Sequence, residues 1–501
     1  MLKRFGILAF ILCCVSPLPS AFASTYIDIE DTAVYDILAQ LEAEGVINDA
    51  LLATRPVSRR EAVRLLHEAK TNALGRNEFI KDLVRELDWR LGPEEDKLRL
   101  VDKVYAKYIG TNADVLPLAY GKTIEQEQAF NANNDGDLYV RGDNYRAGFI
   151  SRAEDLGPLS IYLNPEYRKS GHTEKGVLNT GYGVLGFSWI DVIVGKNSQW
   201  WGPGYHGAIL QSNNAEPLSM VKFTAPHPLT LPWIFKYLGP FQYTLFAARL
   251  EEERGDFSYP YLDGLHFDFK PAPWLEFGLE RVTILGGSGR PLSTGQWMRS
   301  YIGTSGHPSK TSSDYVDTEA GGYIRLTLPL TVQPLQVYWQ RDGEDSRMRK
   351  FGFPYKYADL YGIYLPRIFQ LERIGLRAEY AVTRSKGGWY THGNYTSGMT
   401  YNDMIFGHHM GTDSADLFFE LSYRLPEARA RVLLSYDKET HSRAQVVNEV
   451  TTEGMLRAEL QLSEHLELTV SAGYGRITDP GNQPGNTLCA REVGSELRYR
   501  F

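Results

Sequence analysis

Residues 455–474, MLRAELQLSEHLELTVSAGY, decide the fold that the sequence predicts. Apolar and polar side chains alternate through Met455–Leu462, and the alternation resumes in Leu466–Tyr474. A period of two is that of a β-strand with one apolar and one polar face. Only the residues SEH (463–465) separate the two segments. The stretch therefore predicts two antiparallel strands joined by a tight turn.

The same alternation occurs elsewhere in the chain. LFFELSYRLP (417–426) and ARVLLSY (430–436) predict a second hairpin with an equally short turn. The last nine residues, VGSELRYRF, alternate again and end on Phe501. A terminal aromatic residue on such a last strand resembles the signal by which outer-membrane barrels are recognised for insertion. A last strand must also pair with the first if the sheet is to close without an edge.

Other connections are long and polar, for example residues 289–322 and 385–416. Short turns that alternate with long loops are typical of outer-membrane barrels, which keep the short turns in the periplasm. A soluble β-sandwich would alternate too, but it would have to absorb about 400 residues without a domain break. At about ten residues per strand, plus turns and loops, that length suits roughly 16 to 18 strands. We therefore predict a mainly β transmembrane barrel over residues 99–501.

The segment before the strands has the helical period of 3.6 instead. Residues 24–98 contain three amphipathic stretches, and the first has Val34, Ile37, Leu38 and Leu41 at i, i+3, i+4 and i+7 spacing. Asp31, Ser58 and Asn77 are the expected N-caps, and Gly45 suits the exit of the first helix. Helices this short need a shared core, so we predict a small helical bundle ahead of the barrel.

Residues 1–23 are typical of a secretory signal, with Lys3 and Arg4 before an apolar segment and AFA before the expected cleavage site. The apolar segment is too short for a membrane anchor. Its removal leaves Cys489 as the only cysteine, which excludes a disulfide within the chain. The net charge is −8 and there is no basic block, so nucleic-acid binding is not expected.

One loop stretch, NSQWWGPGYHGAILQSNNAEP (197–217), has two interpretations. Adjacent Trp200 and Trp201 suit an aromatic girdle, because Trp and Tyr favour the membrane–water boundary. They also suit a sugar platform, since flat rings stack on the apolar faces of pyranoses while polar neighbours bind the hydroxyls. The polar neighbours would be Gln199, Tyr205, His206, Asn213 and Asn214. The spacing of these residues is compatible with both interpretations.

A family resemblance appears at these residues. Five blocks resemble, in the same order, the capsule assembly protein Wzi family. They are YDILAQLEAEGVI with TRPVSRREAVRLL (35–66), QWWGPGYHGAILQSNNAEP (199–217), ILGGSGRP (284–291), WYTHGNYTSGMTY (389–401) and GHHMGTDSADLFFEL (407–421). The similarity runs over essentially the whole chain after the signal, and the block at 199–217 is the most specific.

The resemblance implies an 18-stranded outer-membrane barrel with a periplasmic helical bundle near its mouth. It also implies a lectin-like, non-enzymatic protein that attaches or organises capsular polysaccharide at the cell surface. Expected partners are capsular or extracellular polysaccharide, outer-membrane lipid, and periplasmic polysaccharide export machinery reached through the N-terminal helices. The protein is expected to act as a monomer without a cofactor.

Candidate polysaccharide contacts combine stacking rings with hydrogen-bonding groups and a guanidinium that pairs with sugar carboxylates. They are Trp200, Trp201, Tyr205, His206, Arg290, Trp389 and His392. No catalytic motif is found, and no metal site is predicted. The pair His408–His409 lies near Asp403, Asp413 and Asp416. Adjacent histidines on an extended chain point opposite ways, so a hydrogen-bonded loop is expected rather than an ion site.

Two other functions are compatible with a barrel. A diffusion porin or sugar channel predicts an open lumen and measurable conductance, against which the helical bundle and long loops argue. An outer-membrane enzyme acting on glycan or lipid predicts a carboxylate pair or a triad that converges in the lumen, together with turnover of a model substrate. The sequence shows no compact candidate for such a constellation.

Overall fold

The computed structural model of the protein describes residues 23–92, 98–120, 123–302, 316–344, 356–384, 388–442 and 447–501. The expected export signal, residues 1–23, lies outside this part except for Ala23. Among the described residues, no helix is both long enough and apolar enough to cross a membrane.

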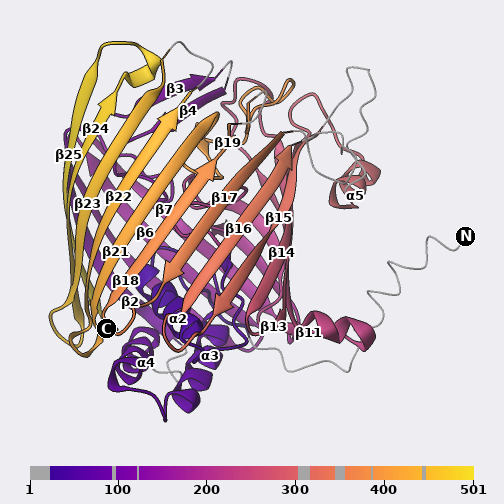
Figure 1. The fold of residues 1–501 in the computed structure, drawn as a ribbon. Coiled ribbons are helices and arrows are strands. Elements are labelled where there is room, and N and C mark those ends of the chain that lie inside the picture. Colours follow the sequence, from indigo (N-terminus) through magenta and orange to yellow (C-terminus); the bar gives the residue numbers. More distant parts are fainter. Residues whose placement is uncertain are drawn as a thin grey trace, which may run out of the picture.

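Eighteen long antiparallel strands form a closed barrel. Figure 1 shows the barrel from the side. Each long strand pairs with the next long strand along the chain. The strands are β2 (Leu98–Thr111), β5 (Gly142–Leu156), β6 (Leu159–Ser170), β7 (Thr173–Gly186), β8 (Asp191–Asn197), β10 (Leu218–Thr224), β12 (Pro240–Arg249), β13 (Tyr261–Ala272), β14 (Leu275–Leu285), β15 (Val316–Leu328), β16 (Leu335–Glu344), β17 (Lys356–Leu365), β18 (Ile374–Val382), β21 (Ser414–Leu425), β22 (Ala430–His441), β23 (Glu449–Gln461), β24 (Leu466–Thr478) and β25 (Thr487–Arg500). The predicted barrel is confirmed.

The first and last strands close the wall. β2 pairs with β25 from Lys103↔Arg500 to Thr111↔Glu492. The hairpin predicted from residues 455–474 is formed by β23 and β24, in which Leu460 pairs with Leu468. Because every wall strand has a partner on both sides, no long edge of unpaired backbone groups remains, which excludes the open sandwich.

The wall has the polarity of a barrel that faces lipid. Leu456, Val470 and Leu497 point outward and are 38–49% exposed. Charged residues of the same sheet point inward, where Arg431 is 3% and Glu420 is 7% exposed. Apolar side chains outside and charged ones inside invert the arrangement of a soluble protein, and they match the alternation of an outer-membrane barrel.

Three helices precede the wall, namely α2 (Thr32–Ala43), α3 (Arg59–Asn72) and α4 (Glu78–Leu91). The Ser58 hydroxyl accepts a hydrogen bond from the Glu61 N–H, and the Asn77 side chain accepts one from the Ile80 N–H. These two predicted caps are confirmed, but the Asp31 cap is wrong. Asp31 makes no capping bond, because its carboxylate pairs with the Lys103 ammonium on β2 at 3.3 Å.

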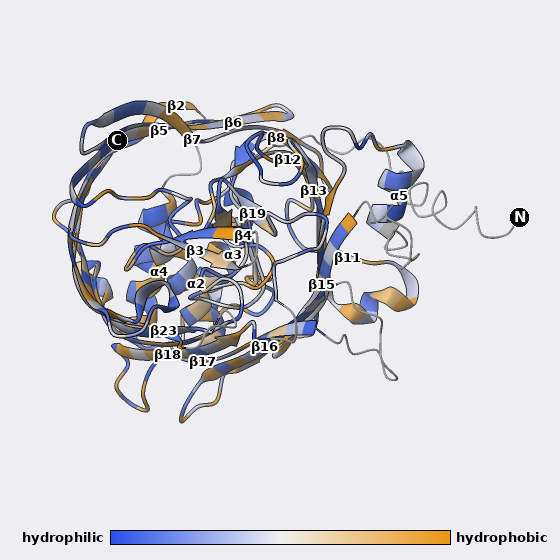
Figure 2. Cartoon of the chain, turned by 90° about the horizontal axis from the view of Figure 1, so that it is seen from above, coloured by the Kyte–Doolittle hydropathy of each residue, from blue (hydrophilic) through white to orange (hydrophobic). Residues whose placement is uncertain are grey.

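The helical domain fills the end of the barrel where the short turns lie, as Figures 1 and 2 show. Its apolar core is its own, formed by residues such as Leu38, Leu65 and Leu83. Charged side chains of its first helix reach the polar inner wall. Glu42 pairs with Lys270 at 2.5 Å and with Arg325 at 3.0 Å. These contacts tie α2 to β13 and β15.

A second set of ion pairs fixes the same helix to strands further along the wall. The Asp36 carboxylate pairs with Arg377 of β18 at 2.9 Å and also with Arg431 of β22. Burial alone would raise the pKa of Asp36, but the two guanidinium groups outweigh it and lower the pKa below its usual range. All three side chains are at least nine-tenths buried. The two guanidinium groups therefore need the Asp36 carboxylate to balance their charge.

The other end of the barrel carries the longer connections, and several of them fold inward (Figure 2). The hairpin β3 (Leu116–Tyr120) with β4 (Thr123–Glu127) lies inside the wall, as does β19 (Thr400–Tyr401) with β20 (Met404–Ile405). Helix α5 (Thr294–Ile302) lies outside it. In the described part of the chain the lumen is therefore occupied at both ends, unlike the open lumen that a porin requires.

The remaining elements are short. They are β1 (Thr54–Arg55), β9 (Trp200–Trp201), β11 (Leu229–Thr230), η2 (Trp233–Leu238), η3 (Pro426–Ala428) and η4 (Pro480–Asn482).

Replacing Asp36 should loosen the helical domain. The change Asp36→Ala leaves two buried guanidinium groups unpaired, which costs about 3–5 kcal/mol. We expect the amide hydrogens of α2 to exchange at least about 100-fold faster, measured by hydrogen exchange in detergent micelles. The control Glu78→Ala removes an exposed ion pair with Lys81 on the same domain and should change exchange of α2 by less than about threefold. Equal exchange in the Asp36 variant and the wild type would contradict this role.

Candidate functional site

The two adjacent tryptophans join a barrel loop to the helical domain. Trp200 and Trp201 form β9, which pairs antiparallel with Thr54–Arg55 of β1. Trp201 is fully buried, with its ring 5.4 Å from that of Phe246. Because a two-residue ladder links the β8–β10 loop to the N-terminal domain, the loop is held inside the lumen.

Trp200 is also enclosed, at 3% exposure. Its indole N–H donates to the Gly204 carbonyl at 3.1 Å, and the Arg55 guanidinium lies 5.5 Å from its ring. A Cβ at Gly204 would collide with the Gly207 carbonyl, so glycine alone fits where the loop turns. Both tryptophans are buried, so neither is open to lipid or to a sugar at the outer surface, and Trp200 borders an internal cavity.

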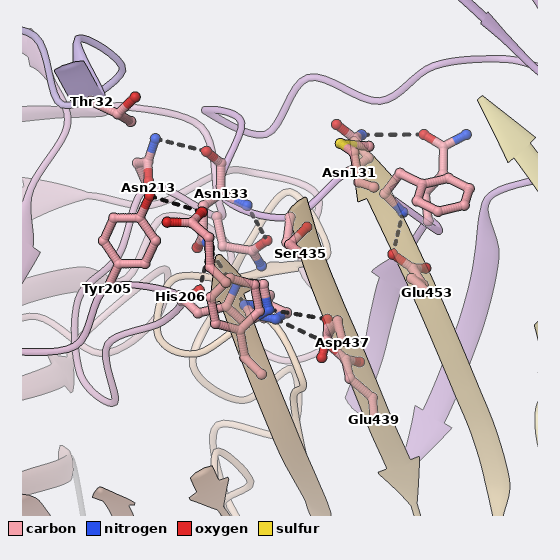
Figure 3. A pocket seen from close by; sticks show the side chains of 18 of the residues that line it. Thr32, Asn131, Asn133, Tyr205, His206, Asn213, Ser435, Asp437, Glu439 and Glu453 are labelled. Carbon is pink, nitrogen blue, oxygen red and sulfur yellow. Dashed lines mark hydrogen bonds and ion pairs between the residues drawn. The ribbon is translucent and has the colours of Figure 1, made fainter. Parts of the chain in front are cut away.

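Tyr205 and His206 follow in the same loop and line an internal cavity of about 290 Å³ (Figure 3). Their backbone N–H groups donate to the Glu379 carboxylate of β18 at 2.6 and 2.8 Å. The His206 ring stacks on Phe418 of β21 with 3.8 Å between centroids. Domain, loops and wall all contribute to the cavity, which is lined among others by Glu30, Arg55, Asn131, Asn133, Trp200, Asn213, His409, Asp437, Glu439 and Glu453.

A cluster of histidines and carboxylates lies at one side of this cavity. His206, His409, Asp416 and Asp437 each place one nitrogen or oxygen atom within 4.8 Å of those of the others. His206 Nε2 is 3.0 Å from Asp437 Oδ2. The sequence analysis considered His408 and His409 with nearby aspartates; the structure instead adds His206, from about 200 residues upstream, and Asp437.

His408 differs from its neighbour His409. It is 1% exposed, and its pKa is lowered well below the usual value by burial and then by the nearby imidazoles of His409 and His206. The pKa of His409 is raised, since the carboxylate of Glu439, 2.9 Å away, outweighs the opposite effect of burial. The neutral form is thus favoured for His408 and the protonated form for His409. Only His409 belongs to the four-residue cluster.

Two further candidates, Arg290 and His392, meet near the long-loop end. The Arg290 guanidinium lies 4.1 Å from the ring centre of Phe257 and 5.8 Å from that of Tyr395. The His392 ring centre is 5.9 Å from the same tyrosine ring. Both side chains are half-buried. We refer to Phe257, Arg290, His392 and Tyr395 as the loop-end cluster.

Trp389, in contrast, is fully buried beside Tyr390, with ring centres 5.6 Å apart. The seven candidate residues thus lie in three places. These are the β1–β9 ladder, which we call the docking ladder, with its nearby core; the internal cavity; and the loop-end cluster.

Asp437, Glu439 and Glu379 also belong to this arrangement, although no local motif in the sequence marks them. Each stands on the polar face of a wall strand, and the period of two could have placed it inside the barrel. The sequence does not show that these residues lie close together. Which residues of different strands are neighbours depends on the register and on the closure of the sheet.

Comparisons with known proteins agree with the fold. A curated Klebsiella pneumoniae protein, described as an uncharacterised 55.8 kDa protein in the cps region, is 25% identical over 327 residues. The match covers 64% of this chain and 58% of that relative. A solved Escherichia coli structure is 18% identical with a TM-score of 0.72, covering 96% of this chain and 100% of the other. It is described as Wzi, an outer-membrane protein involved in group 1 capsule assembly and a carbohydrate-binding β-barrel.

At that identity the E. coli structure shows a shared fold. Membership is shown by a family model described as capsule assembly protein Wzi, which matches residues 121–488. This range includes Trp200–Trp201, the loop and wall residues of the cavity, and the loop-end cluster, but not the N-terminal domain. The chain belongs to the capsule assembly protein Wzi family.

Proposed function

We propose that the protein lies in the outer membrane and binds exported capsular polysaccharide at its long-loop end, without covalent chemistry, so that the capsule is retained at the cell surface. The family's role in capsule assembly and the carbohydrate binding described for the similar E. coli barrel support the class of ligand.

The outward apolar face of the wall supports the membrane location. Helix η2 adds exposed aromatic residues at the short-turn end, where Trp233 is 81% and Tyr237 is 73% exposed. Such rings favour the membrane–water interface. Since outer-membrane barrels keep short turns in the periplasm, the helical domain faces the periplasm and the longer loops face outward. Export machinery would then meet the domain at α3 and α4, and a single chain completes the barrel.

The observation that carries the proposal is the occupied lumen. The N-terminal domain is held at one end by buried ion pairs, and inward loops occupy the other. A polymer is therefore held at the outer surface rather than threaded through the barrel. The loop-end cluster offers a guanidinium, which pairs with sugar carboxylates, beside aromatic rings. Each contact is weak, but repeated sugar units bound by many copies of the protein give avidity.

The buried tryptophans have a different role in this proposal. Trp200 and Trp201 contact no polysaccharide; they hold the β8–β10 loop against the helical domain. Trp389 also contacts no polysaccharide in this proposal, because it is fully buried in the apolar core between the loops and the wall. Sugar contact is assigned to Arg290 and His392.

Removal of a loop-end contact should weaken binding. Purified, detergent-folded Arg290→Ala and His392→Ala proteins are expected to bind the host's capsular polysaccharide on the order of tenfold more weakly than the wild type, measured by biolayer interferometry. The matched control is Arg141→Ala, which removes an exposed arginine paired with Asp114 near the same end of the barrel. Unchanged binding in both cluster variants, or an equal loss in the control, would refute the assignment.

The occupied lumen also predicts little ion flow. In planar bilayers the wild-type protein should show no steady open-pore current, which separates it from a porin or sugar channel. The Asp36→Ala variant, with its loosened domain, should show intermittent openings. Large and stable conductance steps from the wild type would instead favour the channel.

One observation favours an enzyme as a second candidate: carboxylates do converge in the lumen, at Asp416 and Asp437. Both are mostly covered by protein, with side-chain exposures of 3% and 14%. We therefore expect no cleavage when the protein is incubated with capsular polysaccharide, followed by size-exclusion chromatography. Shortening of the polymer that disappears in Asp437→Asn would establish the enzyme instead.

A further inference from the structure

We propose that His206, His409, Asp416 and Asp437 bind one divalent transition-metal ion of the zinc type, which fastens two inward loops to the barrel wall. The proposal does not depend on polysaccharide binding.

The four residues come from four different segments. His206 belongs to the β8–β10 loop and His409 to the β18–β21 loop, while Asp416 and Asp437 face inward from β21 and β22. The two loops already contact each other, for example where the Ser212 hydroxyl donates to the Gly407 carbonyl at 2.5 Å. An ion bound here would cross-link segments that are far apart in the sequence.

The distances between the candidate ligand atoms suit a metal centre. His206 Nε2 lies 3.0 Å from Asp437 Oδ2 and 3.7 Å from Asp416 Oδ2. His409 Nε2 lies 3.6 Å from the same Asp416 oxygen. Four ligands in tetrahedral geometry, each about 2.1 Å from a zinc ion, are about 3.4 Å apart. The observed separations bracket that value without any change of backbone.

An unpartnered buried oxygen is the second, independent observation. Asp416 is 2% exposed, and its Oδ1 has no hydrogen-bond partner. Asp437 Oδ1, also buried, has none either. Buried carboxylate oxygens without a partner are costly, and two carboxylates so close together repel each other. Contacts from the histidines reach the Oδ2 atoms and leave the two Oδ1 atoms unsatisfied. A divalent cation offsets both charges, and coordination through both oxygens of a carboxylate also gives its Oδ1 a partner.

The donor set selects the class of ion. Two imidazole nitrogens with two carboxylate oxygens suit zinc, cobalt or manganese. Calcium prefers a shell of oxygens alone, and no thiolate is present to select a softer ion. The adjoining cavity of about 290 Å³, lined by His206, His409 and Asp437, gives a hydrated ion room to enter and to keep a water ligand.

Surrounding side chains hold the ligands in place. The ring of Phe418 stacks on His206 and restricts its rotation. Glu439 lies 2.9 Å from His409 Nε2 and 3.1 Å from His441 Nε2. Because it contacts the same nitrogen that would bind the ion, Glu439 either moves away when the ion binds or adds an oxygen to the coordination shell.

The test uses the purified full chain in detergent, freed of metal with EDTA and titrated with Zn²⁺ and with Co²⁺. We expect one Zn²⁺ bound per chain by calorimetry, visible d–d absorption bands on addition of Co²⁺, and a melting temperature that rises with Zn²⁺. Failure of the wild type to bind either ion in a saturable manner would overturn the proposal.

Variants locate the site. His409→Ala and the isosteric Asp437→Asn should each weaken Zn²⁺ binding by at least 100-fold and abolish the rise in melting temperature. The control His172→Ala changes an exposed histidine in the β6–β7 turn and should bind as the wild type does. Retention of the barrel, checked by the faster migration of unheated samples in SDS gels, separates lost binding from misfolding. Wild-type affinity in both cluster variants would place the ion elsewhere and refute the assignment.

Discussion

Closure of the sheet is the constraint on which the rest of the structure depends. In lipid no water can satisfy an exposed N–H or carbonyl group, so a spanning sheet must pair its first strand with its last. Here β2 and β25 make that pairing. Closure then assigns every second side chain to lipid and the others to the lumen. The lumen consequently collects charged residues that no soluble core would accept, and they must find partners inside.

The N-terminal domain supplies many of those partners. Asp36 and Glu42 bring carboxylates to the cations of the wall, and both ends of the contact are removed from water. A buried ion pair costs desolvation on both sides, so it adds little net stability, but loss of one partner is expensive. These pairs therefore specify where the domain docks more than they stabilise it. The β1–β9 ladder adds backbone hydrogen bonds that extend this specificity to a loop.

That ladder also explains why the most distinctive sequence block is buried. Trp200 and Trp201 bind the domain, and the turn after them delivers Tyr205 and His206 to the internal cavity. The same loop thus links the N-terminal domain to the proposed metal site, while half-buried Arg290 and His392 lie at the long-loop surface. Occupancy of the metal site would influence how rigidly the inward loops are held beneath that surface.

The sequence by itself determined the barrel, the helical start and the family, because each rests on local pattern. The period of two in Met455–Tyr474 and the caps at Ser58 and Asn77 need no distant contact to be recognised. Only the tertiary structure decided the burial of Trp201 and the meeting of His206 with Asp437. The local sequence around a tryptophan is the same whether its ring lies in an aromatic girdle, stacks on a sugar or is buried in the docking ladder. Residues on separate strands become neighbours only after closure has set their register.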